Sequence, residues 1–225
     1  MTLGVLTIGQ APRADRLGPE VSLVLGDVAR IVERGALDDL SVAAIRALAP
    51  APDREPLVSL LRDGTSVRLE MDAIVPLLQQ RIAQLESEDG VVATLLVCGG
   101  DFPTLRHRRP LIQPHNALHG VVTGIVGGQK LASMVPIPDQ VEPIERGWRR
   151  FRGGELNMVV ANPYATDSVE QVRGAAEAAR NQGADFLYLE CFGYTLAMRE
   201  VARVAFGGPV LLARSLAGRM LGEFC

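Results

Sequence analysis

Short apolar runs without charges alternate along this chain with segments in which apolar residues recur every three or four positions. The clearest run covers 91–97 and is closed by Cys98 and two glycines. A second run covers 184–189, in which Asp185 is the one charged residue, and it is followed by Glu190 and Cys191. A short unbroken apolar run closed by glycine is typical of a buried parallel strand. The alternation therefore predicts parallel sheets whose strands are joined by crossover helices.

The hydrophobic pattern predicts strands and helices along the whole chain. Strands are expected at 3–9, 28–33, 91–97, 111–112, 131–137, 156–161, 184–189 and 209–213. Helices are expected at 13–25, from 37 to the prolines at 50 and 52, and at 71–85, 116–126, 140–151, 168–182, 195–205 and from 215 onward. An antiparallel hairpin is expected at 57–61 and 67–69, around Asp63 and Gly64.

Several helix ends carry residues that favour a boundary. Pro12 suits the first turn of the first helix. An aspartate or a serine is available to cap the second helix, and Ser168 and Ser215 are expected to cap later ones. Gly183 is expected to end a helix in the left-handed conformation.

The two strand-end cysteines are 93 residues apart, which is about the length of one βα lobe. This spacing fits duplicated halves, so we predict an α/β chain of two lobes, each a mostly parallel sheet flanked by helices. The first lobe is expected to cover 1–100 together with 209–225. The second is expected to cover 101–208.

The composition excludes several classes of protein. No apolar run approaches the roughly 18 residues of a membrane span, and no basic segment of a signal peptide precedes the first strand. Three cysteines without C-x-x-C spacing suit a reducing compartment, so a cytoplasmic location is expected. A net charge of -3 gives no reason to expect nucleic acid. Lys130 is the only lysine and precedes a strand, which argues against a pyridoxal Schiff base; no cofactor is expected.

Basic residues and histidines gather at a few positions. The clusters 106–109 and 149–152 are interpreted as solvated loop and helix ends, with an anion site or a subunit contact, and hence a homodimer, as the alternative. His115 and His119 are four residues apart, a spacing that zinc sites on helices use. A solvated helix face is favoured for this pair, and no metal site is predicted.

Chemistry is expected at the two cysteines, because open α/β sheets bind ligands at the carboxyl ends of their strands. Cys98 and Cys191 are each expected just before a helix, where N–H groups and the helix dipole favour a thiolate. The same N–H groups suit a carboxylate or an enolate. A thiolate on one side of a substrate and a thiol on the other could exchange an α-proton without a cofactor. The alternative is that both are buried packing residues.

Three segments, 7–15, 35–40 and 189–194, resemble the AroM-like family, which in turn resembles the aspartate/glutamate/hydantoin racemase superfamily. The resemblance runs over nearly the whole chain. It implies two pseudo-symmetric α/β lobes, an active site in the cleft between them, and a cysteine from each lobe. Cys98 and Cys191 fall on those two positions.

The residues after each cysteine depart from the racemase pattern. Racemases tend to carry Asn-Thr after the first cysteine and Thr-His after the second, where this chain has Gly99-Gly100 and Phe192-Gly193. The hydroxyl and imidazole groups that would assist each thiol are therefore missing from those places. Because Phe192 makes its surroundings more apolar, Cys191 is expected to be the protonated partner and Cys98 the thiolate.

The substrate-binding residues are expected in the strand-end loops. Arg13 follows the first strand and could hold a carboxylate in a bidentate fork. Glu190 should point away from Cys191 and is interpreted as structural. The full set of expected substrate-binding residues is Gln10, Arg13, Gly99, Gly100, Asp101, Tyr164, Phe192 and Gly193, with Thr104 as a weaker candidate.

The function predicted from these observations is that of a cofactor-independent racemase, isomerase or related lyase. It would act at the α-carbon of a small carboxylate, with Cys98 and Cys191 as the acid/base pair. The alternative is a two-lobed protein that senses an anionic metabolite without turning it over.

Overall fold

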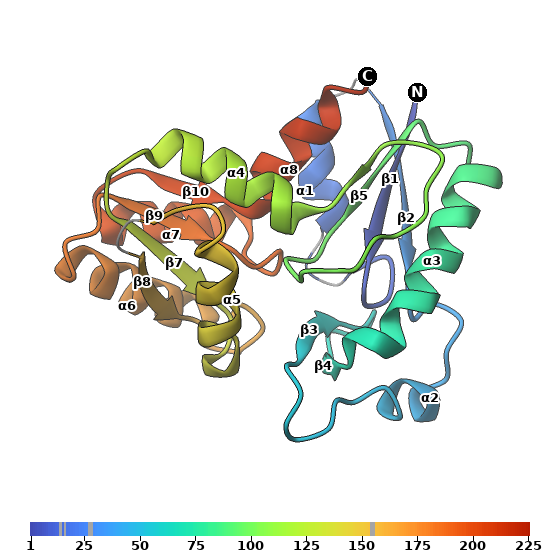
Figure 1. Ribbon diagram of the computed structural model, residues 1–225, viewed down its shortest axis with the longest axis horizontal. Coiled ribbons are helices and arrows are strands. Elements are labelled where there is room, and N and C mark those ends of the chain that lie inside the picture. The colour runs from blue at the N-terminus through green and yellow to red at the C-terminus, as the bar shows by residue number, and fades with distance from the viewer. Residues whose placement is uncertain (14, 16, 27–28, 154–155) are drawn as a thin grey trace. The chain divides into compact units, whose positions relative to one another are not determined.

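The computed structural model describes residues 1–13, 15, 17–26, 29–153 and 156–225 (Figure 1). The chain divides into two compact units, Met1–His115 with Ala217–Cys225 and Asn116–Leu216. Each unit is built on one four-stranded sheet in which every strand pair is parallel. The predicted α/β class with two parallel sheets flanked by helices is therefore confirmed. No helix among these residues is both long and apolar enough to cross a membrane.

The sheet of the first unit has the strand order β2-β1-β5-β6. Its strands are β1 (Thr2–Thr7), β2 (Arg30–Gly35), β5 (Ala93–Leu96) and β6 (Leu111–Ile112). The helices are α1 (Leu17–Leu25), α2 (Val42–Arg46) and α3 (Met71–Ser87), and β3 (Leu57–Leu60) pairs antiparallel with β4 (Ser66–Leu69). The apolar stripe of α3, with Ile74, Leu78, Ile82 and Leu85, packs in one core with Leu6 and Leu96 of the sheet.

The sheet of the second unit has the strand order β10-β9-β7-β8. Its strands are β7 (Leu131–Val135), β8 (Leu156–Val160), β9 (Phe186–Leu189) and β10 (Val210–Leu212). The helices are α5 (Val141–Trp148), which follows the 3-10 turn η1 (Pro138–Gln140), then α6 (Ser168–Asn181) and α7 (Leu196–Phe206). Two further helices, α4 (Pro114–Val126) and α8 (Ala213–Gly222), each contain a boundary between the units.

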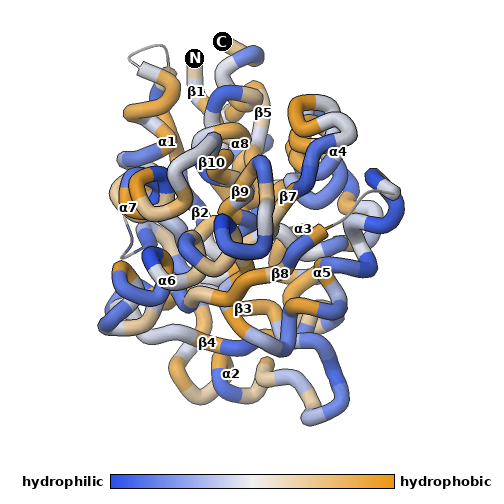
Figure 2. The backbone as a smooth tube through the Cα atoms, turned by 90° about the vertical axis from the view of Figure 1, so that its left-hand side faces the viewer, coloured by the Kyte–Doolittle hydropathy of each residue, from blue (hydrophilic) through white to orange (hydrophobic). Residues whose placement is uncertain are grey.

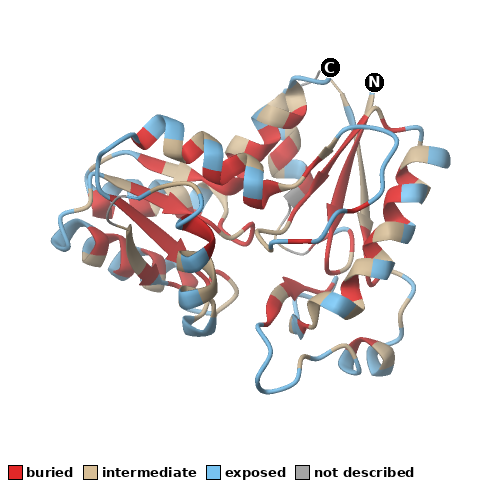
Figure 3. Cartoon of the chain, viewed as in Figure 1, coloured by how far each residue is buried: buried red, intermediate tan, exposed pale blue. Residues whose placement is uncertain are grey.

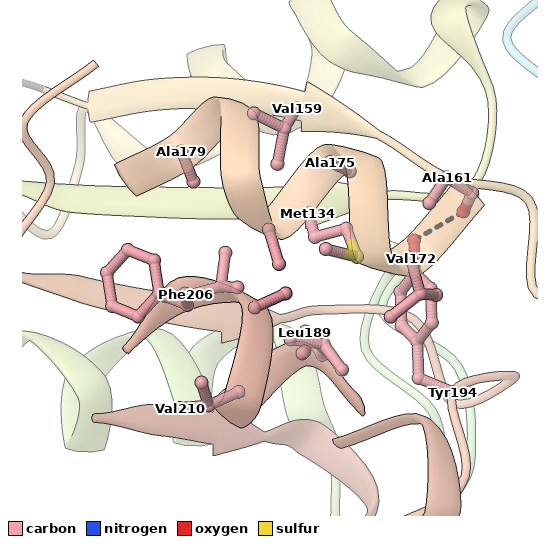
Figure 4. Close-up of a cluster of buried hydrophobic side chains, with 14 of the residues drawn as sticks. Met134, Val159, Ala161, Val172, Ala175, Ala179, Leu189, Tyr194, Phe206 and Val210 are labelled. Carbon is pink, nitrogen blue, oxygen red and sulfur yellow. Dashed lines mark hydrogen bonds between the residues drawn. The ribbon is translucent and has the colours of Figure 1, made fainter. Parts of the chain in front are cut away.

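The two faces of the second sheet differ in chemistry. On one face, Met134, Leu187 and Leu189 pack with α6 and α7, and small alanines of both helices fill the space between them (Figure 4). The other face carries Tyr188 and the buried polar residues Ser133 and Glu190. Figure 3 shows buried residues along β1, β5, β7 and β9, while much of the outer surface of the helices is exposed. The carboxyl-terminal half of β8 is hydrophobic, as the colours of Figure 2 show.

The unit boundaries differ from the predicted ones. The strand β6 pairs with β5, so the first unit extends beyond residue 100 to His115. The strand β10 pairs with β9, so the segment 209–216 belongs to the second unit rather than to the first. Strand pairing decides these assignments, and the hydrophobic pattern of one strand does not identify its neighbour.

Several helix ends also differ from the predicted ones. Pro12 lies in a turn before α1, with a cis Ala11–Pro12 bond, and α2 is only five residues long. Ser41 caps α2, as predicted, whereas the N-cap of α6 is Asp167 and Ser168 is the first helical residue. Ser215 lies inside α8, where its hydroxyl donates to the Leu212 carbonyl, so it is not a cap. Gly183 has the predicted left-handed conformation, with φ 76°. The predicted start of the first helix, residue 13, adjoins residues 14 and 16, and the predicted start of the second strand is residue 28. Residues 14, 16, 27 and 28 lie outside the described residues.

Candidate active site

Asp38 joins two of the segments that carry the family resemblance. Its Oδ1 accepts a hydrogen bond from the Ala11 N–H at 2.8 Å, and its Oδ2 accepts one from the Gly35 N–H at 2.7 Å. The Arg62 guanidinium forms an ion pair with the same carboxylate at 2.8 Å. A Cβ on Gly35 would lie 2.5 Å from the Gly9 carbonyl oxygen, so glycine is required there. This clamp holds the loop after β1 against the loop after β2, and it explains why no helix begins at residue 37.

The polar side chains of the loop after β1 are engaged within the first unit. The Gln10 amide donates to the Leu37 carbonyl at 3.4 Å and accepts from the Arg62 N–H at 3.2 Å. Arg13 is buried, and its Nε and terminal nitrogen donate to the two carboxylate oxygens of Asp15 at 3.0 and 2.8 Å. The fork predicted for a substrate carboxylate is therefore occupied by a carboxylate of the chain itself. A role in substrate binding stays a prediction for both residues.

Cys98 follows β5 and packs, partly buried, against the core of the first unit. No helix follows it directly, because the chain runs as a loop to β6, so the expected helix N-terminus at this thiol is wrong. Gly100 lies close to β3 and α3, since a Cβ there would be 3.0 Å from a Leu57 methyl group. Asp101 and Thr104 are exposed.

A histidine that the local sequence does not predict lies beside the Cys98 loop. His115, in the first turn of α4, has its Nδ1 3.3 Å from the Gly99 carbonyl oxygen. Its Nε2 is 3.9 Å from the Asp101 carboxylate. The segment after β6 thus places an imidazole beside the residues that follow Cys98. The signal was available, because His115 follows the strand next to β5 in the sheet.

Cys191 lies at the carboxyl end of β9, in a tight turn. Its Sγ accepts a hydrogen bond from the Gly193 N–H at 3.3 Å and lies 3.6 Å from the Tyr164 hydroxyl. The helix α7 begins only at Leu196, with Thr195 as its N-cap, so the donor is a turn amide and not the expected helix terminus. Donors directed at a sulfur favour its thiolate form.

Glycine at position 193 allows the tyrosine to reach the sulfur. A Cβ on Gly193 would lie 2.6 Å from the Tyr164 ring and from its hydroxyl oxygen. Tyr164 comes from the loop after β8, where the Asn162 side chain accepts a hydrogen bond from its N–H at 2.9 Å. Of the predicted substrate-binding residues, Tyr164 and Gly193 are therefore brought together with Cys191.

The remaining residues of the turn fix its backbone. The buried Arg214 of α8 donates to the Phe192 carbonyl from Nε at 3.1 Å and from a terminal nitrogen at 2.5 Å. The Tyr194 hydroxyl donates to the Ala161 carbonyl at 2.6 Å, as drawn in Figure 4. Burial raises the pKa of Tyr194 well above its ordinary value, and the charge of a Cys191 thiolate would add to this effect. Tyr194 is therefore a neutral donor that ties the turn to the end of β8.

A cluster of buried polar side chains lies on the face of the second sheet opposite to the face against which Cys191 packs. The Glu190 carboxylate accepts hydrogen bonds from Ser133 at 2.5 Å and Trp148 at 3.0 Å, and it pairs with His119. His119 stacks on Trp148 with ring centroids 4.0 Å apart. We call Glu190, His119, Ser133 and Trp148 the Glu190 cluster. Glu190 points away from Cys191, as predicted, and its structural role stays a prediction. The expectation of a solvated face for His115 and His119 is wrong, because both are buried.

Opposing effects act on the Glu190 carboxyl. Burial is the largest and would raise its pKa. The charge of His119 and the hydrogen bonds from His119, Ser133 and Trp148 act together against burial and hold the pKa below its ordinary value. The carboxylate therefore stays charged directly beside Cys191 in the chain. Sequence reasoning found Glu190 but missed its three partners, because they come from α4, β7 and α5.

The reactive groups of the candidate site are cysteine thiols with hydrogen-bonding groups beside them. Cys98, Cys191 and Cys225 are not in disulfides. No group of three or more His, Cys, Asp or Glu side chains suited to a metal ion occurs among the residues that the structure describes. A thiolate that accepts from the Gly193 N–H, with the Tyr164 hydroxyl 3.6 Å away, can accept a proton from a carbon acid and return it afterwards, or can add to an electrophilic carbon.

Comparison with known proteins agrees with this architecture. The family model described as AroM protein matches residues 3–225. No curated protein matches the chain.

Solved structures share the fold at low sequence identity. Arylmalonate decarboxylase is 17% identical with a TM-score of 0.62, over 99% of this chain and 91% of that one. The maleate isomerase Iso of Pseudomonas putida S16 is 13% identical with a TM-score of 0.61, over 99% and 93%. Picrophilus torridus aspartate racemase is 12% identical with a TM-score of 0.59, over 99% and 93%. At these identities the likeness shows the two-unit α/β fold alone.

Proposed function

The chain belongs to the AroM protein family, and from that premise and the chemistry around Cys191 we propose that it is a cofactor-independent enzyme acting at the α-carbon of a small carboxylate. The reaction class is racemisation, isomerisation or decarboxylation. The structurally similar proteins named above are a racemase, an isomerase and a decarboxylase. The observation that carries the proposal is the Cys191 sulfur at a strand end, with the Gly193 N–H and the Tyr164 hydroxyl directed at it.

The proposed step begins with the Cys191 thiolate. It removes the α-proton of the substrate and becomes a thiol, while the electron pair of the C–H bond moves into the carboxylate as an enolate. The same thiol then returns a proton to the carbon. If a substrate loses CO₂ instead, the electron pair of the broken C–C bond forms the enolate, and a cysteine thiol protonates it. Both routes balance without an oxidant, a reductant or a bound cofactor.

The division of work between the two cysteines is part of the proposal. Inversion at the carbon requires a second proton donor on the opposite face, and Cys98, with His115 and Asp101 near its loop, is the proposed partner. The donors around Cys191 favour the thiolate there, which is the reverse of the expectation from Phe192. A one-cysteine reaction would need Cys191 alone.

Solvent exchange tests the proposal. Candidate 2-amino, 2-hydroxy and substituted malonic acids are incubated with the protein in heavy water, and deuterium at the α-carbon is measured by NMR. We expect incorporation for one class of acid, and a loss of about a hundredfold or more in Cys191→Ala. The matched control is Cys225→Ala, which removes an exposed thiol at the end of the chain.

The outcomes separate the mechanisms. Loss of exchange and of inversion in both Cys98→Ala and Cys191→Ala supports a two-base reaction. Full activity in Cys98→Ala supports the one-cysteine route. If no acid exchanges but one of them raises the melting temperature, the enzyme proposal fails and a sensor of an anionic metabolite is the better description.

A further inference from the structure

A groove of about 660 Å³ lies in the first unit, between the second half of α3 and the loop that joins β5 to β6. Its lining includes Gln79, Glu86 and the basic segment 106–109. The volume is within the range of small-molecule sites. We call this feature the arginine groove.

The backbone of the basic segment is fixed to α3. The Gln79 side chain accepts a hydrogen bond from the Arg106 N–H at 2.8 Å and donates to the Arg106 carbonyl at 2.6 Å. Glu86 Oε1 accepts from the N–H groups of Arg108 and Arg109 at 2.7 and 2.9 Å. Gln79 and Glu86 lie on one face of α3, seven residues apart. The loop therefore holds its shape through its backbone, and its arginine side chains are not used to do so.

The three guanidinium groups are available for a ligand. Arg106, Arg108 and Arg109 are exposed, and within the described ranges none of them forms an ion pair or a side-chain hydrogen bond. By contrast, Arg34 and Arg81 of the same unit each pair with a carboxylate, at 2.5 Å for Asp89 and 2.7 Å for Asp39. Glu86 also lines the groove, but its Oε1 is already bound by two N–H groups. Three positive charges within four residues thus face a concave surface without compensation.

The arginine groove is separate from the cysteine of its own unit. The Pro110 carbonyl, directly after the basic segment, accepts a hydrogen bond from the Thr94 N–H at 2.9 Å. Thr94 is near the amino end of β5, and Cys98 follows the carboxyl end of the same strand. The groove therefore lies toward the amino end of β5, whereas Cys98 lies beyond its carboxyl end.

We propose that the arginine groove binds a small anion that carries two or more phosphoryl groups. Guanidinium groups bind phosphate oxygens in a bidentate fork and keep their charge at any physiological pH. Three adjacent forks match a diphosphate or triphosphate better than a single carboxylate. A small ligand is favoured over nucleic acid because the basic residues form one local cluster on a chain with a net charge of -3.

Isothermal titration calorimetry with inorganic pyrophosphate and with tripolyphosphate tests this proposal. We expect saturable binding that weakens as NaCl is added. The variant Arg106→Gln/Arg108→Gln/Arg109→Gln should bind at least about tenfold more weakly. The matched control, Arg149→Gln/Arg173→Gln/Arg203→Gln, removes three exposed arginines from the surface of the second unit and should bind normally. Unchanged far-UV circular dichroism shows that each variant is folded.

A further variant separates a built site from general positive charge. Gln79→Ala keeps the net charge but releases the Arg106 backbone, so it should also weaken pyrophosphate binding. Normal binding by Gln79→Ala or by the groove triple variant would overturn the proposal, as would the lack of saturable binding to either anion. Tighter binding of a single-stranded oligonucleotide than of tripolyphosphate would overturn it in favour of a nucleic-acid surface.

Discussion

At the scale of single residues, each residue of the turn after β9 makes a different contact. Glu190 points into the polar cluster, Cys191 carries the sulfur, and the Phe192 carbonyl is held by Arg214. Gly193 supplies an N–H to the sulfur and leaves room for Tyr164.

Gly193→Ala tests this arrangement. The added Cβ would lie 2.6 Å from the Tyr164 ring, so the tyrosine must move away from the sulfur. Loss of one donor to a thiolate is worth about 1.5 kcal/mol, or roughly tenfold. We therefore expect the alkylation of Cys191 by iodoacetamide near pH 7, followed by mass mapping, to slow by about that factor. Tyr164→Phe should have the same effect.

The control for this substitution is Gly174→Ala, since nothing lies within 4 Å of a Cβ at that position in α6. It should leave the alkylation rate unchanged. If Gly193→Ala and Tyr164→Phe both alkylate at the original rate, the tyrosine does not assist the sulfur. If only Cys225 is alkylated, Cys191 is a packing residue.

At the scale of elements, the Glu190 cluster ties four segments of the second unit together. Glu190 follows β9, and its partners belong to α4, β7 and α5. All four side chains are buried, so the cluster replaces apolar contacts on this face of the sheet with directional ones. Breaking a buried ion pair by removing one partner leaves the other charge uncompensated.

Glu190→Gln should lower the free energy of unfolding by about 3 kcal/mol near neutral pH. Because the folded-state pKa of Glu190 lies below its ordinary value of 4.5, its contribution is present above that value and is lost as the pH falls through the lowered pKa. The stability difference between the two proteins should therefore shrink in acid. Urea unfolding at a series of pH values measures it.

Glu200→Gln is the surface control for this prediction. Glu200 is exposed on α7 and pairs with Arg203, which lowers its pKa through a hydrogen bond in solvent. Its removal should leave the unfolding curve nearly unchanged at every pH. A Glu190→Gln protein as stable as the original near pH 7 would show that the cluster does not stabilise the fold.

At the scale of the whole molecule, each unit has a hydrophobic core of its own. Leu78 is fully buried in the core of the first unit, and Ala176 is fully buried in that of the second. Neither of these two cores shares a residue with the other. Damage to one core is therefore expected to act first on its own unit.

Leu78→Ala should cost about 2–5 kcal/mol by leaving a cavity, and Ala176→Leu about 1–3 kcal/mol by overpacking. Hydrogen exchange read by mass spectrometry should increase mainly in β1, β5 and α3 for the first variant. For the second it should increase mainly in α6, α7 and β9. Glu177→Leu places the same leucine on the exposed side of α6 and is the control. An equal increase across both units for each variant would show a single cooperative fold.

The local pattern of apolar residues by itself determined the α/β class, the strand positions and the two cysteines at strand ends. These features follow from periodicity, which is a property of neighbouring residues, and from the rule that parallel strands place ligands at their carboxyl ends. The hairpin at 57–69, the amphipathic helix α3 and the glycine at 183 were predictable for the same reason.

Only the tertiary structure decided which groups meet. The contacting residues are far apart in the chain, so the local sequence does not reveal their contacts. Cys191 and Tyr164 are 27 residues apart, Phe192 and Arg214 are 22 apart, and Glu190 and His119 are 71 apart. Strand order brings His115 beside the Cys98 loop and assigns β10 to the second unit. The groups around the Cys191 sulfur come from its own turn and from the loop after β8. Side-chain direction and strand pairing are set by long-range packing, which no local pattern encodes.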